Sequence, residues 1–303
     1  MDKLGICKYD LGNIYNILGL PELLRTLIDS KVFDVTYHDD RIGATKGERG
    51  SIIYFNDKKI YLDVWDYACP THSPQVWDAN FDLIIKLQHS SVDANQYDIS
   101  CNAKHQLFLD HTAEERKAFW NKIVPWTFFC SRMMRRFIGK EDEITSEPIT
   151  QLAWFCGKHW RCRKGIAESL KRNGIEYVTS SQELYQTGRP LTDEEYIKKM
   201  KSSQLGLVLH GRSSAFSQSL NRREIDYMML KKPLLLNYKP YYYNSFIEGK
   251  HYIYFNEKSS LKDLIKMYNI EDIAKNGYEW YLKNASQKGI VDTFLQIIKE
   301  RIK

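Results

Sequence analysis

Seven residues suited to binding a phosphorylated ligand gather in one stretch of the chain, from the end of the apolar run LGLVLH to the apolar run PLLLNY. They are His210, Gly211, Arg212, Ser213, Arg222, Arg223 and Glu224. Arginine makes bidentate contacts to phosphate oxygens, and the free N–H groups at a helix N-terminus favour the same ligand. A glutamate beside them suits two vicinal hydroxyls, as on a ribose. The pattern predicts a nucleotide diphosphate pocket, and a solvated helix face is the alternative.

A second basic cluster follows an earlier apolar run, LAWFC, at residues 152–156. It contains Lys158, Arg161 and Arg163, which we assign to the same pocket; a surface patch or a nucleic-acid contact is the alternative. From Gln151 to Lys232 there are 15 Lys and Arg residues against 8 Asp and Glu, a surplus of seven, whereas the whole chain carries +6. A surplus confined to one region indicates an anionic ligand there rather than a generally basic surface.

Two aspartates in the first half, Asp63 and Asp66, lie three residues apart where the run IYLDVWD ends. A carboxylate at such a place can take the proton from a hydroxyl that attacks an electrophilic carbon. We favour Asp66 because it stands further along the loop, and the alternative is that both are turn or cap residues. Trp65 and His89 are candidates for binding the hydroxyl-bearing molecule, Trp65 by stacking its ring on a sugar face.

The elements that would position these residues are clearest in the second half. Apolar runs predict strands at 152–156, 175–178, 205–210, 233–238 and 251–255. Helical patterns lie between or after them at 162–174, 191–204, 220–230 and 261–268, and Thr192 and Glu195 have capping-box spacing. Unbroken apolar strands that alternate with helices predict a doubly wound domain, whose parallel sheet is covered on both faces. Ligands of such sheets bind beyond the carboxyl ends of the strands.

The first half is less regular but also predicts an α/β domain. We expect strands at 4–9, 32–38, 81–88 and 105–109, and a helix within 13–29. Residues 51–66 read as two strands joined at Asn56-Asp57, which is typical of a hairpin. The polar segment 139–150 marks a boundary, so we expect an N-terminal lobe at 1–145 and a C-terminal lobe at 146–303.

Composition excludes several other classes of protein. Hydrophobic residues at 43% and charged residues at 27% are typical of a folded globular chain rather than a disordered one. No run approaches the roughly 18 apolar residues of a membrane span, and the N-terminus has no signal-peptide core. The six cysteines show neither a CxxC pair nor metal-type spacing, so we expect reduced thiols and a cytoplasmic protein, in the host cytoplasm if it is viral.

The second half also resembles a known family. The order of strand, glycine, basic residues and helix at 150–174, followed by the stretch 194–237 and by YYNSFIEGKHYIYF and NGYEWYLKNAS, looks like the donor-binding domain of GT-B glycosyltransferases. It is most similar to the exostosin-like and CAP10-like groups and to related enzymes of large DNA viruses. In that resemblance Glu224 matches the glutamate that holds the ribose, and the KKP turn at 231–233 has Lys where Gly is common. The resemblance covers about residues 150–290.

The resemblance implies two Rossmann-like lobes with a cleft between them, and transfer of a sugar from a nucleotide diphosphate sugar. It implies that 1–145 is the acceptor-binding lobe and 146–303 the nucleotide-sugar-binding lobe. A UDP-sugar is the default donor, a glycan or glycoconjugate hydroxyl the acceptor, and an inverting reaction with an Asp base the expected course. We expect no metal and no other cofactor, because no Asp-x-Asp ends a strand in the second half. We expect no nucleic-acid partner and no membrane span, and the oligomeric state stays open. The alternatives are a nucleic-acid-binding protein without catalysis and a sugar-nucleotide epimerase of the same fold.

Overall fold

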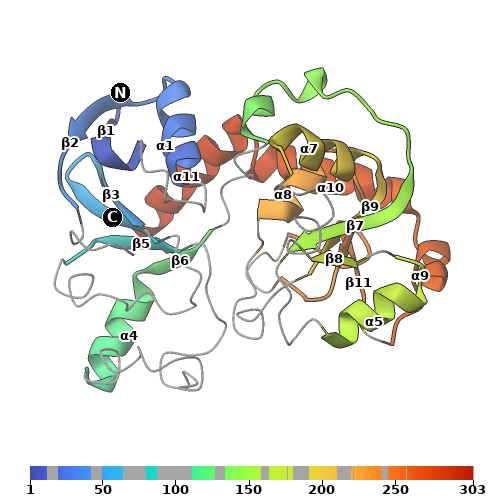
Figure 1. Ribbon diagram of the computed structural model, residues 1–303. Helices are drawn as coiled ribbons and strands as arrows, with labels where there is room; N and C mark the ends of the chain where they lie inside the picture. The colour runs from blue at the N-terminus through green and yellow to red at the C-terminus, as the bar shows by residue number, and fades with distance from the viewer. Residues whose placement is uncertain are drawn as a thin grey trace. The chain divides into compact units, whose positions relative to one another are not determined.

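The computed structural model of the chain shows two compact units, each built around its own β-sheet (Figure 1). The structure describes residues 1–11, 20–41, 50–63, 80–86, 111–126, 134–157, 164–175, 177–179, 191–209, 220, 222–240, 245–256 and 258–302. The first unit holds the described residues of Met1–Arg132 and of Gln287–Lys303. The second holds most of what lies between, up to Ser286.

The sheet of the first unit has six strands in the order β2-β1-β3-β4-β5-β6. They are β1 (Lys3–Cys7), β2 (Asp34–His38), β3 (Gly50–Phe55), β4 (Lys58–Asp63), β5 (Leu83–Lys86) and β6 (Ile123–Pro125). Only β3 runs against its neighbours, because it forms a hairpin with β4 through the two residues Asn56-Asp57. Asn56 adopts a left-handed backbone (φ 54°), as such tight turns require. The predicted hairpin is confirmed.

Helices cover both faces of this sheet. One face, which includes Ile53 and Leu62, shares a core with α1 (Leu20–Asp29) and α11 (Gln287–Arg301). The other face, which includes Ile52 and Ile84, packs against α4 (Ala113–Asn121). These side chains alternate along each strand, so one strand supplies both cores. Figure 1 shows α11, from the end of the chain, lying beside α1 from its beginning.

The sheet of the second unit has five parallel strands in the order β11-β10-β9-β7-β8. They are β7 (Gln151–Gly157), β8 (Tyr177–Thr179), β9 (Ser203–Val208), β10 (Leu234–Leu236) and β11 (Tyr252–Tyr254). The helices are α5 (Lys164–Arg172), α7 (Asp193–Lys201), α8 (Arg222–Met229), α9 (Leu261–Met267) and α10 (Ile270–Asn284). Short 3₁₀ turns at Arg135–Phe137 and Glu141–Glu143 precede β7.

Helix α8 lies against the sheet at unusually close range. Gly206 in β9 makes this possible, because a side chain there would collide with the ring of Tyr227. The Tyr227 hydroxyl then donates a hydrogen bond to the Trp154 carbonyl in β7, at 3.0 Å. On the opposite face of the sheet, Leu205 and Leu207 pack with Leu170 of α5 and with Leu261 of α9. Both faces are therefore covered.

The predicted α/β class with two sheet-containing lobes is confirmed, and so is the capping box of α7, where Thr192 and Glu195 exchange hydrogen bonds. Strand β6 and helices α10 and α11 were not among the predicted elements. The strand expected at 105–109 lies outside the described residues. Among the helices that the structure describes, none has the length and apolar character needed to cross a membrane.

Candidate functional site

The carboxyl edge of the second sheet carries a fully buried carboxylate, that of Glu224. Helix α8 leads from β9 to β10, and these strands are parallel, so its first turn lies at their carboxyl edge. Arg222, Arg223 and Glu224 make up this turn, and the arginines are half-buried while Glu224 is 0% exposed. The predicted helix is thus present, with these three residues in its first turn.

Tyr238, just beyond the end of strand β10, holds the Glu224 carboxylate in place. It follows the end of β10 by two residues, is itself buried, and donates a short hydrogen bond from its hydroxyl to Glu224 Oε1. A buried carboxylate is costly unless donors surround it, so the phenol hydroxyl contributes to keeping Glu224 in this position. The arrangement presents an acceptor beside a helix N-terminus, where donors and positive dipole favour anions.

All seven of the other residues predicted for this pocket lie outside the described residues. They are Lys158, Arg161, Arg163, His210, Gly211, Arg212 and Ser213. The structure therefore brings together Arg222, Arg223 and Glu224 and does not test the rest. In the first unit, Asp66, Trp65 and His89 also lie outside the described residues.

Asp63 is described, and it forms a buried ion pair. It ends β4, and its Oδ2 lies 2.9 Å from Nζ of Lys86, which ends the neighbouring parallel strand β5. The Asp63 side chain is 1% exposed and that of Lys86 is 0% exposed. Each charge compensates the other at the carboxyl edge of the first sheet, and such a pair is held tightly in place.

A second buried carboxyl group lies at the same edge and was missed by the sequence analysis. Asp10 follows β1 in the 3₁₀ turn Lys8–Leu11 (η1), and its Oδ2 accepts a hydrogen bond of 2.5 Å from the hydroxyl of Ser51 in β3. Cys7, the last residue of β1, is buried beside it. The available signal was the position of Asp10 just beyond a buried strand, which is where parallel sheets place ligand-binding groups.

Burial perturbs the proton affinity of this cluster. Desolvation raises the pKa of Asp10 above its ordinary value, although hydrogen bonds from Ser51 and Cys7 and the charges of Arg41 and His38 oppose the effect. Burial, and then the charge of Asp10, also raises the pKa of the Cys7 thiol. An aspartate with a raised pKa is a stronger base than a solvated one, which makes Asp10 a candidate for accepting a proton.

No group of three or more His, Cys, Asp or Glu side chains that could hold a metal ion occurs among the residues that the structure describes.

Comparisons with solved structures find similar architecture at low sequence identity. A variant of S. aureus TarM, solved with Fondaparinux, alpha-GlcNAc-glycerol and UDP, matches 82% of this chain with 12% identity and a TM-score of 0.43. A glycosyltransferase from Rickettsia africae matches 96% of the chain with 14% identity and a TM-score of 0.43, over 83% of its own length. The pneumococcal O-GlcNAc transferase GtfA, solved with UDP and GlcNAc, matches 88% with 13% identity and a TM-score of 0.39.

The chain spans only 62% of that TarM chain and 66% of the GtfA chain. No protein-family model matches the sequence. No curated protein sequence matches it either. The similarity to the exostosin-like, CAP10-like and viral groups stays a prediction.

Proposed function

We propose that this chain is a GT-B glycosyltransferase that moves a sugar from a nucleotide diphosphate sugar to a hydroxyl of a glycan or glycoconjugate. The second unit binds the donor, with a UDP-sugar as the first candidate. The first unit supplies the base. The reaction needs no metal ion, because cationic side chains stabilise the leaving group.

The observation that carries this proposal is the buried carboxylate of Glu224 in the first turn of α8. It stands at the carboxyl edge of a parallel sheet, the edge where such sheets bind ligands, and Tyr238 orients it. A fixed carboxylate can accept hydrogen bonds from both hydroxyls of a ribose. Arg222 and Arg223 stand in the same turn and supply the positive charge that a diphosphate requires.

The chemistry follows from these charges. A carboxylate of the first unit takes the proton of the acceptor hydroxyl, and the oxygen attacks the anomeric carbon. The bond between that carbon and the donor phosphate breaks, and the nucleoside diphosphate leaves with the bonding electrons. Arg222, Arg223 and the helix N-terminus stabilise the developing negative charge.

Asp66 is the base that the sequence favours, with Asp63 as the second choice. Asp10 joins them on the strength of its raised pKa, which matches the task better than the ion-paired Asp63 does. An Asp base that acts directly on the acceptor inverts the configuration at the anomeric carbon.

Thermal stability in the presence of nucleotide sugars tests the donor site. UDP-, GDP-, ADP- and CMP-sugars are compared with and without EDTA, since a ligand that binds the native state raises the melting temperature. We expect a shift with UDP-sugars that survives EDTA. Glu224→Gln keeps the shape of the side chain but loses the charge, and we expect affinity to fall about 10- to 100-fold, since hydrogen bonds to a charged group contribute about 1.5–3 kcal/mol.

Glu22→Gln is the matched control. Glu22 is also a buried glutamate in the first turn of a helix, but it belongs to α1 in the first unit. Its replacement should leave the UDP-sugar shift intact. A shift lost equally in both variants would mean that Glu224 acts only on stability. No shift with any sugar nucleotide, together with a salt-sensitive shift from single-stranded oligonucleotides, would favour the nucleic-acid-binding alternative.

A further inference from the structure

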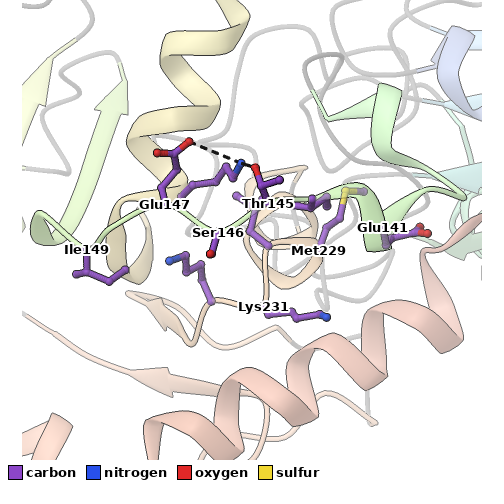
Figure 2. A pocket seen from close by; sticks show the side chains of 11 residues that line it. Glu141, Thr145, Ser146, Glu147, Ile149, Met229 and Lys231 are labelled. Carbon is purple, nitrogen blue, oxygen red and sulfur yellow. Dashed lines mark hydrogen bonds and ion pairs between the residues drawn. The ribbon is translucent and has the colours of Figure 1, made fainter.

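A pocket of about 540 Å³ opens at the amino edge of the second sheet, the edge opposite to Glu224 (Figure 2). Each segment that lines it precedes a strand: residues 141–149 precede β7, Lys201 precedes β9, and residues 229–232 precede β10. Its volume falls within the range of about 300–1,000 Å³ that is typical of small-molecule sites. Its lining contains none of the residues predicted for the donor site or for the base.

The lining of this pocket is rich in lysine, with Lys201, Lys231 and Lys232. Lys201 is engaged, because its Nζ donates to Thr145 Oγ1 at 3.1 Å and lies 4.0 Å from Glu147 Oε1. Figure 2 shows Thr145 and Glu147 together at this contact, with Ser146 next to them. Among the described ion pairs, neither Lys231 nor Lys232 has a carboxylate within 4.0 Å.

The other acid in the pocket, Glu141, has hydrogen-bond partners of its own. Oε1 of Glu141 accepts hydrogen bonds from the Tyr281 hydroxyl at 2.7 Å and from the Gly139 N–H at 3.1 Å. Burial, and then repulsion by the Lys201 ammonium, lowers the pKa of half-buried Lys232 below its ordinary value. An anion between these two ammonium groups would remove that repulsion.

Lys231 adopts a backbone conformation that favours glycine. It follows α8 with a φ of 54°, and its N–H bonds to the Met228 carbonyl while that of Lys232 bonds to the Tyr227 carbonyl. This is the Schellman ending, in which glycine is the usual residue at the left-handed position. A lysine there costs free energy, so its side chain is a candidate for a role that glycine cannot fill.

We propose that this pocket binds a small molecule that carries a phosphate group and an apolar body. Lys231 and Lys232 supply positive charge, and the contact of the Lys231 ammonium with the Tyr278 ring, 4.5 Å from its centre, leaves that charge in place. The hydroxyl of Ser146 is a hydrogen-bond donor for a phosphate oxygen. Ile144, Ile149 and Met229 line the remainder and suit the apolar part of the ligand. The proposal does not depend on the proposed function, because the pocket lies at the other edge of the sheet.

Lysine acylation followed by mass spectrometry tests the site residue by residue. The rate at Lys232 is measured with and without phenyl phosphate and compared with the rate at Lys31, an exposed lysine of the first unit. We expect saturating phenyl phosphate to slow acylation of Lys232 severalfold and to leave Lys31 unchanged. Equal rates at Lys232 with and without the probe would overturn the proposal.

Calorimetric titration with phenyl phosphate and with inorganic phosphate measures the affinity. Lys232→Gln and Lys231→Gly should each weaken binding about 10-fold, the equivalent of one charged contact. Lys31→Gly is the matched control, because Lys31 also follows a helix and has a φ of 56°. Tighter binding of phenyl phosphate than of inorganic phosphate is expected from the apolar lining.

Arg222→Gln separates this pocket from the donor site. We expect it to leave the affinity for phenyl phosphate unchanged. If that affinity depends on Arg222 and not on Lys231 or Lys232, the probe binds at the donor edge and the proposal is wrong, while the proposed function stands. If UDP-sugars fail to bind but phenyl phosphate still requires Lys232, the proposed function fails alone.

Discussion

Two aspartates are buried at the carboxyl edge of the first sheet, and their partners differ. At the ends of β4 and β5, Asp63 faces a lysine, and Oδ2 and Nζ are 2.9 Å apart. Near the end of β1 and the start of β3, Asp10 faces the hydroxyl of Ser51. The first carboxylate has a full positive charge beside it and the second has a neutral donor.

This difference decides what each carboxyl group is able to do. The ion pair with Lys86 links the ends of two neighbouring strands, so Asp63 is suited to holding β4 and β5 together. A hydroxyl compensates desolvation less well, and the pKa of Asp10 is raised. Asp10 is therefore the better candidate of the two for a general base.

The largest expected effect comes from removing the lysine of the ion pair. Lys86→Met leaves Asp63 charged and buried, which should lower the free energy of unfolding by about 3–5 kcal/mol. Ser51→Ala removes only a neutral donor from Asp10 and should cost about 1 kcal/mol. Urea unfolding of both variants measures the two losses. The double change Asp63→Leu with Lys86→Met should recover most of the first loss, and equal losses in Lys86→Met and Ser51→Ala would contradict the contrast.

The next effect concerns catalysis. Asp10→Asn removes a proton acceptor and should lower kcat about 100-fold or more if Asp10 is the base, with little change in the donor-dependent melting shift. Asp82→Asn is the control, because Asp82 is exposed at the opposite edge of the sheet, where it accepts a hydrogen bond from the Lys59 N–H. If Asp66→Asn abolishes transfer and Asp10→Asn does not, the base that the sequence favours is the correct one.

Features that depend on residues close in the sequence could be predicted, whereas features that depend on distant residues could not. The capping box of Thr192 and Glu195 and the hairpin at Asn56-Asp57 were predictable because each depends on neighbours in the chain. The position of Asp10 just beyond a strand was visible in the sequence, but its hydrogen bond with Ser51, 41 residues away, was not predictable.

Distance along the chain also hid two other features. Helix α11 packs with α1 from the opposite end of the chain, and no pattern within either segment predicts that contact. The lysines of the phosphate pocket lie at or just after the ends of α7 and α8. Basic residues are common there because they complement the helix dipole, so the sequence alone did not indicate a binding site.

A smaller effect is the pH dependence of stability at Asp10. Its pKa is raised from 3.8 in the folded state, so the folded protein holds this proton more tightly than the unfolded chain does. The wild type therefore loses stability as pH rises from about 4 through the folded pKa. Asp10→Asn removes this loss. The melting temperature of the variant minus that of the wild type should therefore increase as pH rises from about 4 through the folded pKa of Asp10, and then stay constant. A difference that is constant from pH 4 to pH 8 would show that the carboxyl does not titrate in the folded state.

The smallest effect separates two lysines that share one backbone conformation. Lys31 and Lys231 both follow helices with φ near 55°, at 56° and 54°. Replacement by glycine relieves the left-handed strain and should stabilise the protein at Lys31 by about 0.5–1 kcal/mol. At Lys231 the same gain is offset, because its ammonium lies 4.5 Å from the centre of the Tyr278 ring, a contact of about 0.5–1 kcal/mol. Thermal unfolding should therefore show a rise for Lys31→Gly and almost none for Lys231→Gly. An equal rise in both would mean that the aromatic ring does not hold the Lys231 side chain, which would leave its ammonium free to turn toward the phosphate pocket without losing a partner.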